Sequence, residues 1–558
     1  MVETSRREPD RPNILVLLVD EERYPPVYEN EEIKEWRRRN LTAQNGLRQH
    51  AVEFRRHYIG SSACSPSRAT LFTGHYPSLH GVSQTTGIAK EPFDSDMFWL
   101  DRNTVPTMGD YFREGGYQTH YRGKWHISYP DIINPGTHDS IPSYDTFSGV
   151  PNPKLERLYQ SANRLDGYGF SGWIGPEPHG KNPRNSASSA GFGVSGRDPF
   201  FAAETVELLT ALDLQKKQDQ AAKPWLVVCS LVNPHDIVLY GSLTERMAAF
   251  RFQVDPDVPD VAPPPTLYES LQTKPRCQAS YRDTYPKALQ PIWNQPFYRR
   301  LYYQLQKNAD QQMAKVIDAL ARTSFYDDTI VVFASDHGDL LGAHGHLFQK
   351  FYCAYEEFLH VPILFHNKRL FPGHSFVDSL TSHIDLVPTL LGLAGIDAES
   401  IRERLKGTFS EARKLVGRDL SPWLLDRSAQ PIPNEPIYFM TDDDVTRGQH
   451  QVSPFGVPYA SVVQPNRIET VIAPIPRNGK TQLWKYSRYF AGDSNDGGEG
   501  IPDEYELYNL SEDPLEVFNL AHSAHASPET MKVQKSMMRV LEAQRKQKRL
   551  LPEQPGIS

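Results

Sequence analysis

Residues 14–22 read ILVLLVDEE, an uninterrupted run of branched apolar side chains that ends abruptly in carboxylates. Such a run is typical of a β-strand buried on both faces, as in a parallel sheet. Similar runs occupy residues 225–232 and 329–334, with a weaker one at 117–121, and each leads directly into polar or ionisable side chains. Because the carboxyl ends of parallel strands share one edge of a sheet, we expect these polar segments to meet there.

Helical patterns separate these runs. Apolar residues recur at intervals of three and four from Leu305 to Leu320, which places one apolar stripe on a helix just before the run at 329–334. Alternating helices and buried strands predict an α/β fold. We assign residues 11–415 to a catalytic domain and 416–558 to a smaller C-terminal α+β domain. Strand-like pieces at 436–440 and 483–490 and a helical pattern at 528–545 predict a short antiparallel sheet and a closing helix there.

Two long segments, residues 127–222 and 238–300, differ from the rest of the chain. Both are rich in Pro, Gly, Ser and Asn, with scattered aromatic residues. This composition is typical of loops. We therefore expect long loops that cover the polar edge of the sheet and determine specificity.

The composition limits the classes of function. The formal net charge of −8 argues against a nucleic-acid-binding surface, and it means that an anionic substrate must be attracted by local cations. The N-terminal residues MVETSRREPDRP lack the apolar core of a signal peptide, and no stretch is apolar for long enough to span a membrane. Four cysteines in 558 residues form no disulfide framework, so we expect a cytoplasmic protein with no nucleic-acid or membrane partner.

The segment Cys64-Ser-Pro-Ser-Arg68 carries the strongest chemical signal. Ser65 is a suitable helix cap, Pro66 suits the first helical turn, and Gly74 can end the helix. Cys64 would then lie at a helix N-terminus, where the helix dipole acidifies a thiol, and Arg68 can reach back from one turn later. For Cys64 considered alone, a buried structural cysteine is the alternative.

The pattern Cys-x-Pro-Ser-Arg resembles the signature of the type I sulfatases. Other segments of that family are matched in the same order, namely Asp20-Glu21, Gly123-Lys-Trp-His126, Asn233-Pro-His235, Ser335-Asp-His-Gly338 with Lys350 beyond it, and Glu506-Leu-Tyr-Asn-Leu510. The resemblance covers most of the chain. It implies the fold shared with alkaline phosphatase, a large mixed, mostly parallel sheet flanked by helices.

The resemblance implies a modified nucleophile and a metal. In the family a formylglycine-generating enzyme oxidises the signature cysteine, here Cys64, to formylglycine, whose hydrated gem-diol is the nucleophile. The implied ligands of one divalent cation are Asp20, Glu21, Asp336 and His337, with Ca²⁺ favoured over Mn²⁺ or Mg²⁺. Glu21 stands where Asp is usual and His337 where Asn is common, and a nitrogen ligand shifts the preference somewhat toward Mn²⁺.

The resemblance also implies roles for the remaining cations. Arg68 would orient the gem-diol, and Lys124 and Lys350 would bind sulfate oxygens. His235 is the implied acid for the departing alcohol, assisted by Lys350, and His126 would take a proton as sulfate is released.

The implied function is hydrolysis of a small-molecule sulfate monoester. A phosphodiester or phosphonate monoester hydrolase of the same superfamily is an alternative, but those relatives tend to lack the Lys-x-His pair kept here as Lys124 and His126. A catalytically silent, metal-containing binding protein is the alternative from another class. The sequence leaves open whether the ester is aryl, alkyl, choline or carbohydrate sulfate. It also leaves open a homo-oligomer packed through the C-terminal helix.

Overall fold

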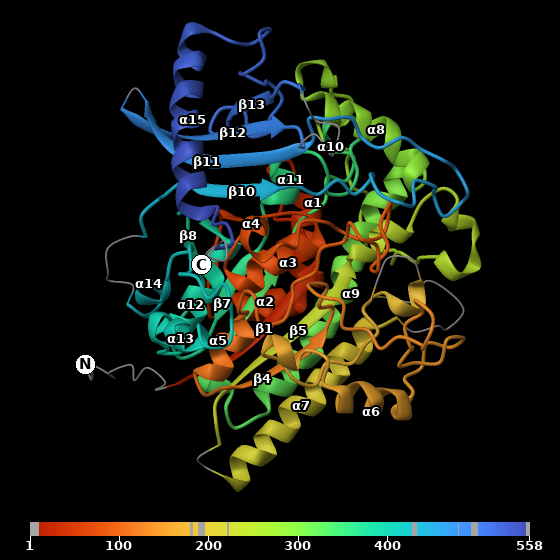
Figure 1. Ribbon diagram of the computed structural model, residues 1–558, viewed down its shortest axis with the longest axis vertical. Helices are drawn as coiled ribbons and strands as arrows, with labels where there is room; N and C mark the ends of the chain where they lie inside the picture. The colour runs from red at the N-terminus through yellow and green to blue at the C-terminus, as the bar shows by residue number, and fades with distance from the viewer. Residues whose placement is uncertain are drawn as a thin grey trace, which may run out of the picture.

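The centre of the molecule is a large β-sheet. The computed structural model describes residues 11–178, 182–187, 196–219, 222–426, 432–477, 479–492 and 500–553. The strand order is β4-β5-β1-β6-β7-β2-β8 (Figure 1). These strands are, in that order, Gln118–Gly123, Trp225–Pro234, Asn13–Asp20, Thr329–Ser335, Ile363–His366, Ala51–Phe54 and Ser375–Val377.

The sheet is mixed and mostly parallel, as predicted. The four strands expected from the sequence, β4, β5, β1 and β6, are adjacent and parallel to one another. The strand β7 runs antiparallel to both β6 and β2, and β2 pairs in parallel with β8. The carboxyl ends of the four predicted strands therefore lie along one edge.

Helices cover both faces of this sheet. On β1, Leu15, Leu17 and Val19 face a core shared with α2 (Thr42–Arg48), α7 (Asp198–Gln218) and α9 (Gln295–Ala321). The alternate side chains of β1 pack toward α3 (Cys64–Thr73), α5 (Met108–Glu114) and α12 (Leu386–Leu393). Because both faces are covered, β1 needs a continuous apolar sequence rather than an alternating one.

Two segments expected to be loops contain helices, so that prediction is wrong in part. Residues 127–222 include α6 (Pro153–Ala162) and the whole of α7, and residues 238–300 include α8 (Arg276–Ala288) and the start of α9. Within α7, Phe201, Leu209 and Leu212 are buried against the sheet. The polar, Gly- and Ser-rich residues just before α7 dominated the average composition and concealed this apolar stripe.

A second, antiparallel sheet lies near the C-terminus, together with the closing helix, as predicted. Its order is β10-β11-β12-β13, and its strands are Ile437–Thr441, Arg467–Arg477, Lys480–Phe490 and Glu504–Asn509. One face packs on α15 (Pro528–Lys548), and the other meets the large domain (Figure 1). The division at residue 415 stays a prediction, and α14 (Ser421–Leu425) packs on α12 of the large domain.

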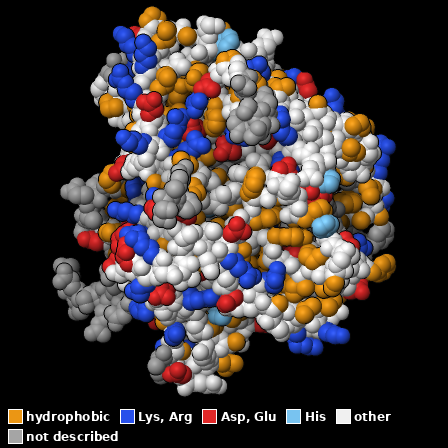
Figure 2. Space-filling view, viewed as in Figure 1, with side chains coloured by type: hydrophobic (Ala, Val, Ile, Leu, Met, Phe, Trp, Pro, Cys, Tyr) orange, Lys and Arg blue, Asp and Glu red, His pale blue; other side chains and the backbone are white. Residues whose placement is uncertain are grey.

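Two further strands and five further helices belong to the fold. The strands are β3 (His57–Tyr58) and β9 (Thr381–Ser382), and the helices are α1 (Glu31–Asn40), α4 (Pro77–His80), α10 (Ala343–His346), α11 (Glu356–Leu359) and α13 (Ala398–Leu405). Within the described ranges, no helix combines the length and the apolar composition needed to cross a membrane. On the face shown in Figure 2, basic and acidic side chains are interspersed.

A buried carboxylate secures α15 to the C-terminal sheet. Glu469 on β11 has no exposed side-chain surface, and it pairs with Arg545 of α15 and with Arg549 directly after that helix, whose side chains are 32% and 27% exposed. Burial opposes ionisation of Glu469, but the arginines and Tyr438 lower its pKa below 4.5. A carboxylate with a lowered pKa stabilises the fold above its unfolded pKa, and this contribution is lost as the pH falls through the folded value.

We therefore expect Glu469→Gln to lower the free energy of unfolding by about 2 kcal/mol at neutral pH. The difference in unfolding free energy between the variant and the unchanged protein should shrink as the pH falls below 4.5, the ordinary pKa of a glutamate side chain. Urea unfolding at several pH values measures both effects. The matched control is Glu529→Gln, because Glu529 pairs with Arg477 while 73% exposed. An equal loss in both variants would contradict a special role for Glu469.

Candidate active site

The nucleophile candidate begins a fully buried helix. All ten residues of α3 are buried, and Gly74 ends the helix with a left-handed φ of 68°, as predicted. The prediction that Ser65 caps the helix is wrong, because the helix begins at Cys64 with Ala63 in the cap position. A carboxylate from a distant part of the chain contacts the residue before the helix, since Asp443 accepts a hydrogen bond of 3.2 Å from the Ala63 backbone N–H.

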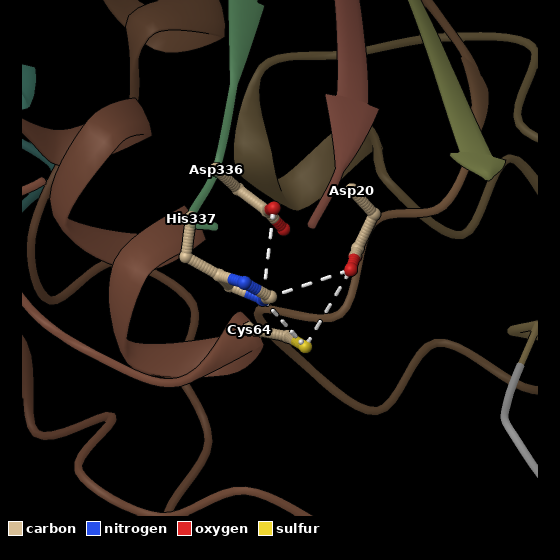
Figure 3. Close-up of side chains that lie close together, drawn as sticks. All are labelled: Asp20, Cys64, Asp336 and His337. Carbon is tan, nitrogen blue, oxygen red and sulfur yellow. Dashed lines mark hydrogen bonds and ion pairs between the residues drawn. The ribbon is translucent and has the colours of Figure 1, made fainter. Parts of the chain in front are cut away.

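Cys64 points into the cluster of polar residues at the sheet edge (Figure 3). Its Sγ lies 3.1 Å from Nε2 of His337 and 3.8 Å from Oδ1 of Asp20. Burial, together with the Asp20 carboxylate, raises the pKa of the Cys64 thiol to about 11. The direction is opposite to the acidification expected at a helix N-terminus, because burial removes hydration from the thiolate and Asp20 repels its charge.

Arg68 joins three strand ends beneath Cys64. Its Nε donates to Oδ2 of Asp336 at 2.7 Å, and one Nη donates to Oδ2 of Asp20 at 3.0 Å. The other Nη donates to the carbonyl of Lys124 at 2.7 Å and to Oγ of Ser230 on β5 at 2.9 Å. Arg68 has no exposed surface, so these partners replace the water that a guanidinium requires.

Two lysines complete a buried group of cations. Lys124 Nζ lies 2.7 Å from Oδ2 of Asp20, and Lys350 Nζ lies 2.6 Å from Oε2 of Glu21. Burial opposes the charge on Lys350, but Cys64 and Glu21 raise its pKa above the usual value, so it stays protonated. An oxyanion that enters this site would therefore meet fixed positive charge.

The two histidines lie on the more accessible side of the site. His126 and His235 are each 7% exposed, compared with 2% for Cys64. Burial, with help from Lys124, holds the pKa of both histidines well below the usual value, so both are neutral. Nδ1 of each histidine is buried, with no hydrogen-bond partner within the described part of the chain. A neutral imidazole with a free nitrogen can accept a proton from a bound group.

The chemistry of the carboxylates fits a cation. Asp20, Cys64, Asp336 and His337 offer ligand atoms within 4.8 Å of one another, and Asp20, Glu21 and His235 form a second such group. The structure thus groups Glu21 with Asp20 but not with Asp336 or His337, although its backbone N–H donates to Asp336 at 3.1 Å. Oε1 of Glu21 is buried without a partner among the residues described, which suits an oxygen donor to a divalent ion.

The ten site residues predicted from the sequence converge at this edge. The contacts above join nine of them. The tenth, His126, lies near enough for the charges of Lys124, Arg68 and Asp20 to affect its pKa. The distance from Cys64 to Asp20 satisfies the spatial requirement on which the prediction depended. Their catalytic and metal-binding roles stay predictions.

Sequence reasoning missed three residues that support the site. Ser230 interrupts an apolar strand, and this polar residue could have been noticed beside the strand end. Asp443 and Glu177 act on the segments around Cys64 and His126 from distant parts of the chain. No local pattern marks either of these acidic residues.

Comparison with known proteins adds evidence independent of this geometry. Residues 12–396 match the family profile described as Sulfatase. The chain is 27% identical over 368 residues to the uncharacterized sulfatase YidJ of Escherichia coli, a match that covers 65% of this chain and 64% of that relative. It is 24% identical over 526 residues to a choline-sulfatase of Rhizobium meliloti, covering 92% of this chain and 83% of that protein. The fold is similar to that of a 2-O GAG sulfatase, with a TM-score of 0.62 and 21% identity. That match covers 96% of this chain and 92% of the other.

Proposed function

The chain belongs to the sulfatase family, and from this premise we propose that it hydrolyses sulfate monoesters with Cys64, oxidised to formylglycine, as the nucleophilic residue. One observation carries the proposal. Position 64 faces Asp20 and His337 inside a site that holds three buried cations, Arg68, Lys124 and Lys350. The unmodified thiol, with a pKa of about 11, is a weak nucleophile at neutral pH.

We further propose that one divalent cation, Ca²⁺ in preference to Mn²⁺ or Mg²⁺, binds beside position 64. Asp20, Asp336 and His337 would hold it, with Glu21 as a fourth ligand through Oε1. When bound, the cation would acidify the nucleophile and withdraw charge from a sulfate oxygen. Arg68 donates hydrogen bonds to both Asp20 and Asp336. These bonds fix the orientation of two of the proposed ligands.

The proposed roles of the remaining side chains follow from their positions in the site. Lys124 and Lys350 would bind the sulfate oxygens, since each ammonium is buried and already faces a carboxylate of the site. His235, neutral in the free site, would take up a proton when the anionic sulfate group binds and would then protonate the departing alcohol, while His126 would hold a proton taken during sulfate release. The departing group would lie beside the two histidines, where the site is most exposed.

The proposal is tested on full-length protein co-expressed with a formylglycine-generating enzyme. Peptide mass spectrometry across Cys64 should show an aldehyde in place of the CH₂SH side chain. The sample should hydrolyse members of a panel of aryl, alkyl, choline and carbohydrate sulfates, lose activity with a chelator and regain it with Ca²⁺ or Mn²⁺. Inactivity of converted, metal-loaded protein on the whole panel would contradict the proposal. Faster hydrolysis of matched phosphonate monoesters or phosphodiesters would favour the phosphorus-ester alternative.

The proposed role of His126 predicts unequal effects on the two halves of the reaction. His126→Ala should leave a rapid first release of alcohol, in an amount equal to the active sites, and slow later turnovers by about 100-fold. Stopped-flow or quenched-flow assays of an aryl sulfate measure both phases. His450→Ala is the control, because His450 pairs with Asp94 while 45% exposed. Equal slowing of both phases would mean that His126 acts before the alcohol departs.

A further inference from the structure

The turn that carries Lys124 and His126 is held through its backbone. Gly123 has a left-handed φ of 95°, and His126 has a φ of 58°, which is unusual for a residue with a side chain. The Lys124 N–H donates to the carbonyl of Ser230 at 3.0 Å. The Lys124 carbonyl accepts hydrogen bonds from Arg68 and from the hydroxyl of Tyr121, at 2.7 and 2.6 Å. Hydrogen bonds from residues beyond the turn, Ser230, Arg68 and Tyr121, therefore support its first half.

The side chain of Glu177 contacts the backbone of the second half. Oε1 of Glu177 accepts a hydrogen bond of 2.9 Å from the Trp125 N–H. Burial and the neighbouring Asp131 raise the pKa of Glu177 to about 8, while the His126 backbone, Lys124 and Arg68 oppose this rise. The hydrogen bond from Trp125 therefore ties the turn, one residue before His126, to an acidic side chain from a distant part of the chain. This arrangement holds His126 in a conformation that its own backbone preference disfavours.

Glu177 is itself held from both sides. Its backbone N–H donates to Oδ1 of Asp131 at 2.7 Å, and its carbonyl accepts a hydrogen bond of 2.8 Å from the Asn185 side chain. Ser140 in turn donates to the other oxygen of Asp131 at 2.5 Å. The carboxylate is therefore fixed relative to the turn, as a supporting residue must be if it is to orient a reactive one.

From these contacts we infer that Glu177 is a positioning residue that presents the imidazole of His126 to the sulfate-binding site. The inference rests on the proposed sulfatase reaction. Glu177 has a structural effect through the backbone of residues 124–126 and does not touch the reacting atoms. Loss of its carboxylate would let the turn relax toward an ordinary backbone conformation and move the imidazole away.

The kinetic test is a double-mutant cycle on converted, metal-loaded protein. We expect Glu177→Ala to lower kcat by about 10- to 100-fold and to change KM by less than about 3-fold. In a His126→Ala background, the same change should cost less than about 3-fold, because the residue through which it acts is already gone. Glu177→Gln, whose amide oxygen can still accept from the Trp125 N–H, should keep kcat within about 3-fold. Losses that multiply in the double variant, or an unchanged kcat in Glu177→Ala, would overturn the inference.

A second measurement does not depend on activity. Hydrogen exchange followed by mass spectrometry should show faster exchange of the Trp125 and His126 amides in Glu177→Ala than in the unchanged protein. Glu204→Ala is the matched control, because Glu204 is a half-buried acidic residue that pairs at 3.9 Å with Arg122 on the adjoining strand β4. Unchanged exchange at these two amides would overturn the inference.

Two provisions keep the outcomes distinct. If Glu177→Ala does not fold, Glu177→Asp replaces it, because the shorter side chain withdraws the carboxylate from the turn, and its expected kcat loss has the same sign. If the unchanged, converted protein hydrolyses no sulfate ester, the proposed function fails, while the exchange measurement still decides whether Glu177 holds the turn.

Discussion

Replacing Cys64 by alanine should reduce hydrolysis of every accepted sulfate ester by about 10⁴-fold or more while leaving the fold intact. Position 64 supplies the nucleophile in the proposed reaction, and the neighbouring His337 and Asp20 have a different proposed role, as ligands of the cation. The structural cost should be small, since alanine removes only a buried sulfur from the first turn of a helix with many other contacts. Steady-state assays and thermal unfolding of the same preparations measure the two effects.

Another buried cysteine provides the control for this prediction. Cys277 lies in the second large core cluster, with Sγ 3.6 Å from the carbonyl of Tyr352. Cys277→Ala should keep its activity although it also removes a buried thiol. Preserved turnover in Cys64→Ala would contradict a covalent role for position 64. Equal losses in both variants would point to general destabilisation.

Asp336→Asn should weaken metal retention by about 100-fold and lower activity accordingly. The amide preserves the size of the side chain but removes the negative charge that faces His337 and Arg68. Arg68 would then keep only one carboxylate partner, so net positive charge at the site would rise and disfavour a bound cation. Elemental analysis after dialysis measures the metal content, and titration with Ca²⁺ or Mn²⁺ should restore part of the activity.

The matched control is a buried aspartate in a helix that packs on the sheet. Asp310 of α9 accepts hydrogen bonds from the backbone of Ala43 and Gln44 at the start of α2, at 2.8 and 3.0 Å. Asp310→Asn should leave metal content unchanged while lowering stability. Unaltered metal content in Asp336→Asn would exclude this carboxylate as a ligand.

The strands were predictable in proportion to their burial. Residues 14–19, 225–232 and 329–334 became β1, β5 and β6, whose continuous apolar sequences reflect helices packed on both faces. The run at 117–121 was weaker because β4 forms one edge of the sheet and alternates between buried and half-buried residues. The strands β2, β7 and β8 have four residues or fewer and left no periodic signal.

The residues of the candidate site were predictable because their order along the chain follows the strand ends. Asp20, His235 and Asp336 each come directly after or at the end of a buried strand, and parallel strands bring such residues to one edge. Cys64 and Lys350 lie outside this pattern, and only the resemblance to a known family included them. Their convergence agrees with that resemblance, while their individual roles await the variants above.

The sequence by itself determined which strands are buried, which edge gathers the ionisable side chains and which cysteine faces them, because these depend on local patterns of polarity and on one short motif. Only the tertiary structure decided the state of these groups. Burial beside Asp20 raises the pKa of the Cys64 thiol, Asp443 binds the backbone directly before the helix that Cys64 begins, and Glu177 supports the turn at His126. Desolvation and hydrogen bonds between distant segments exist only once the chain has folded, so no local pattern could have predicted them.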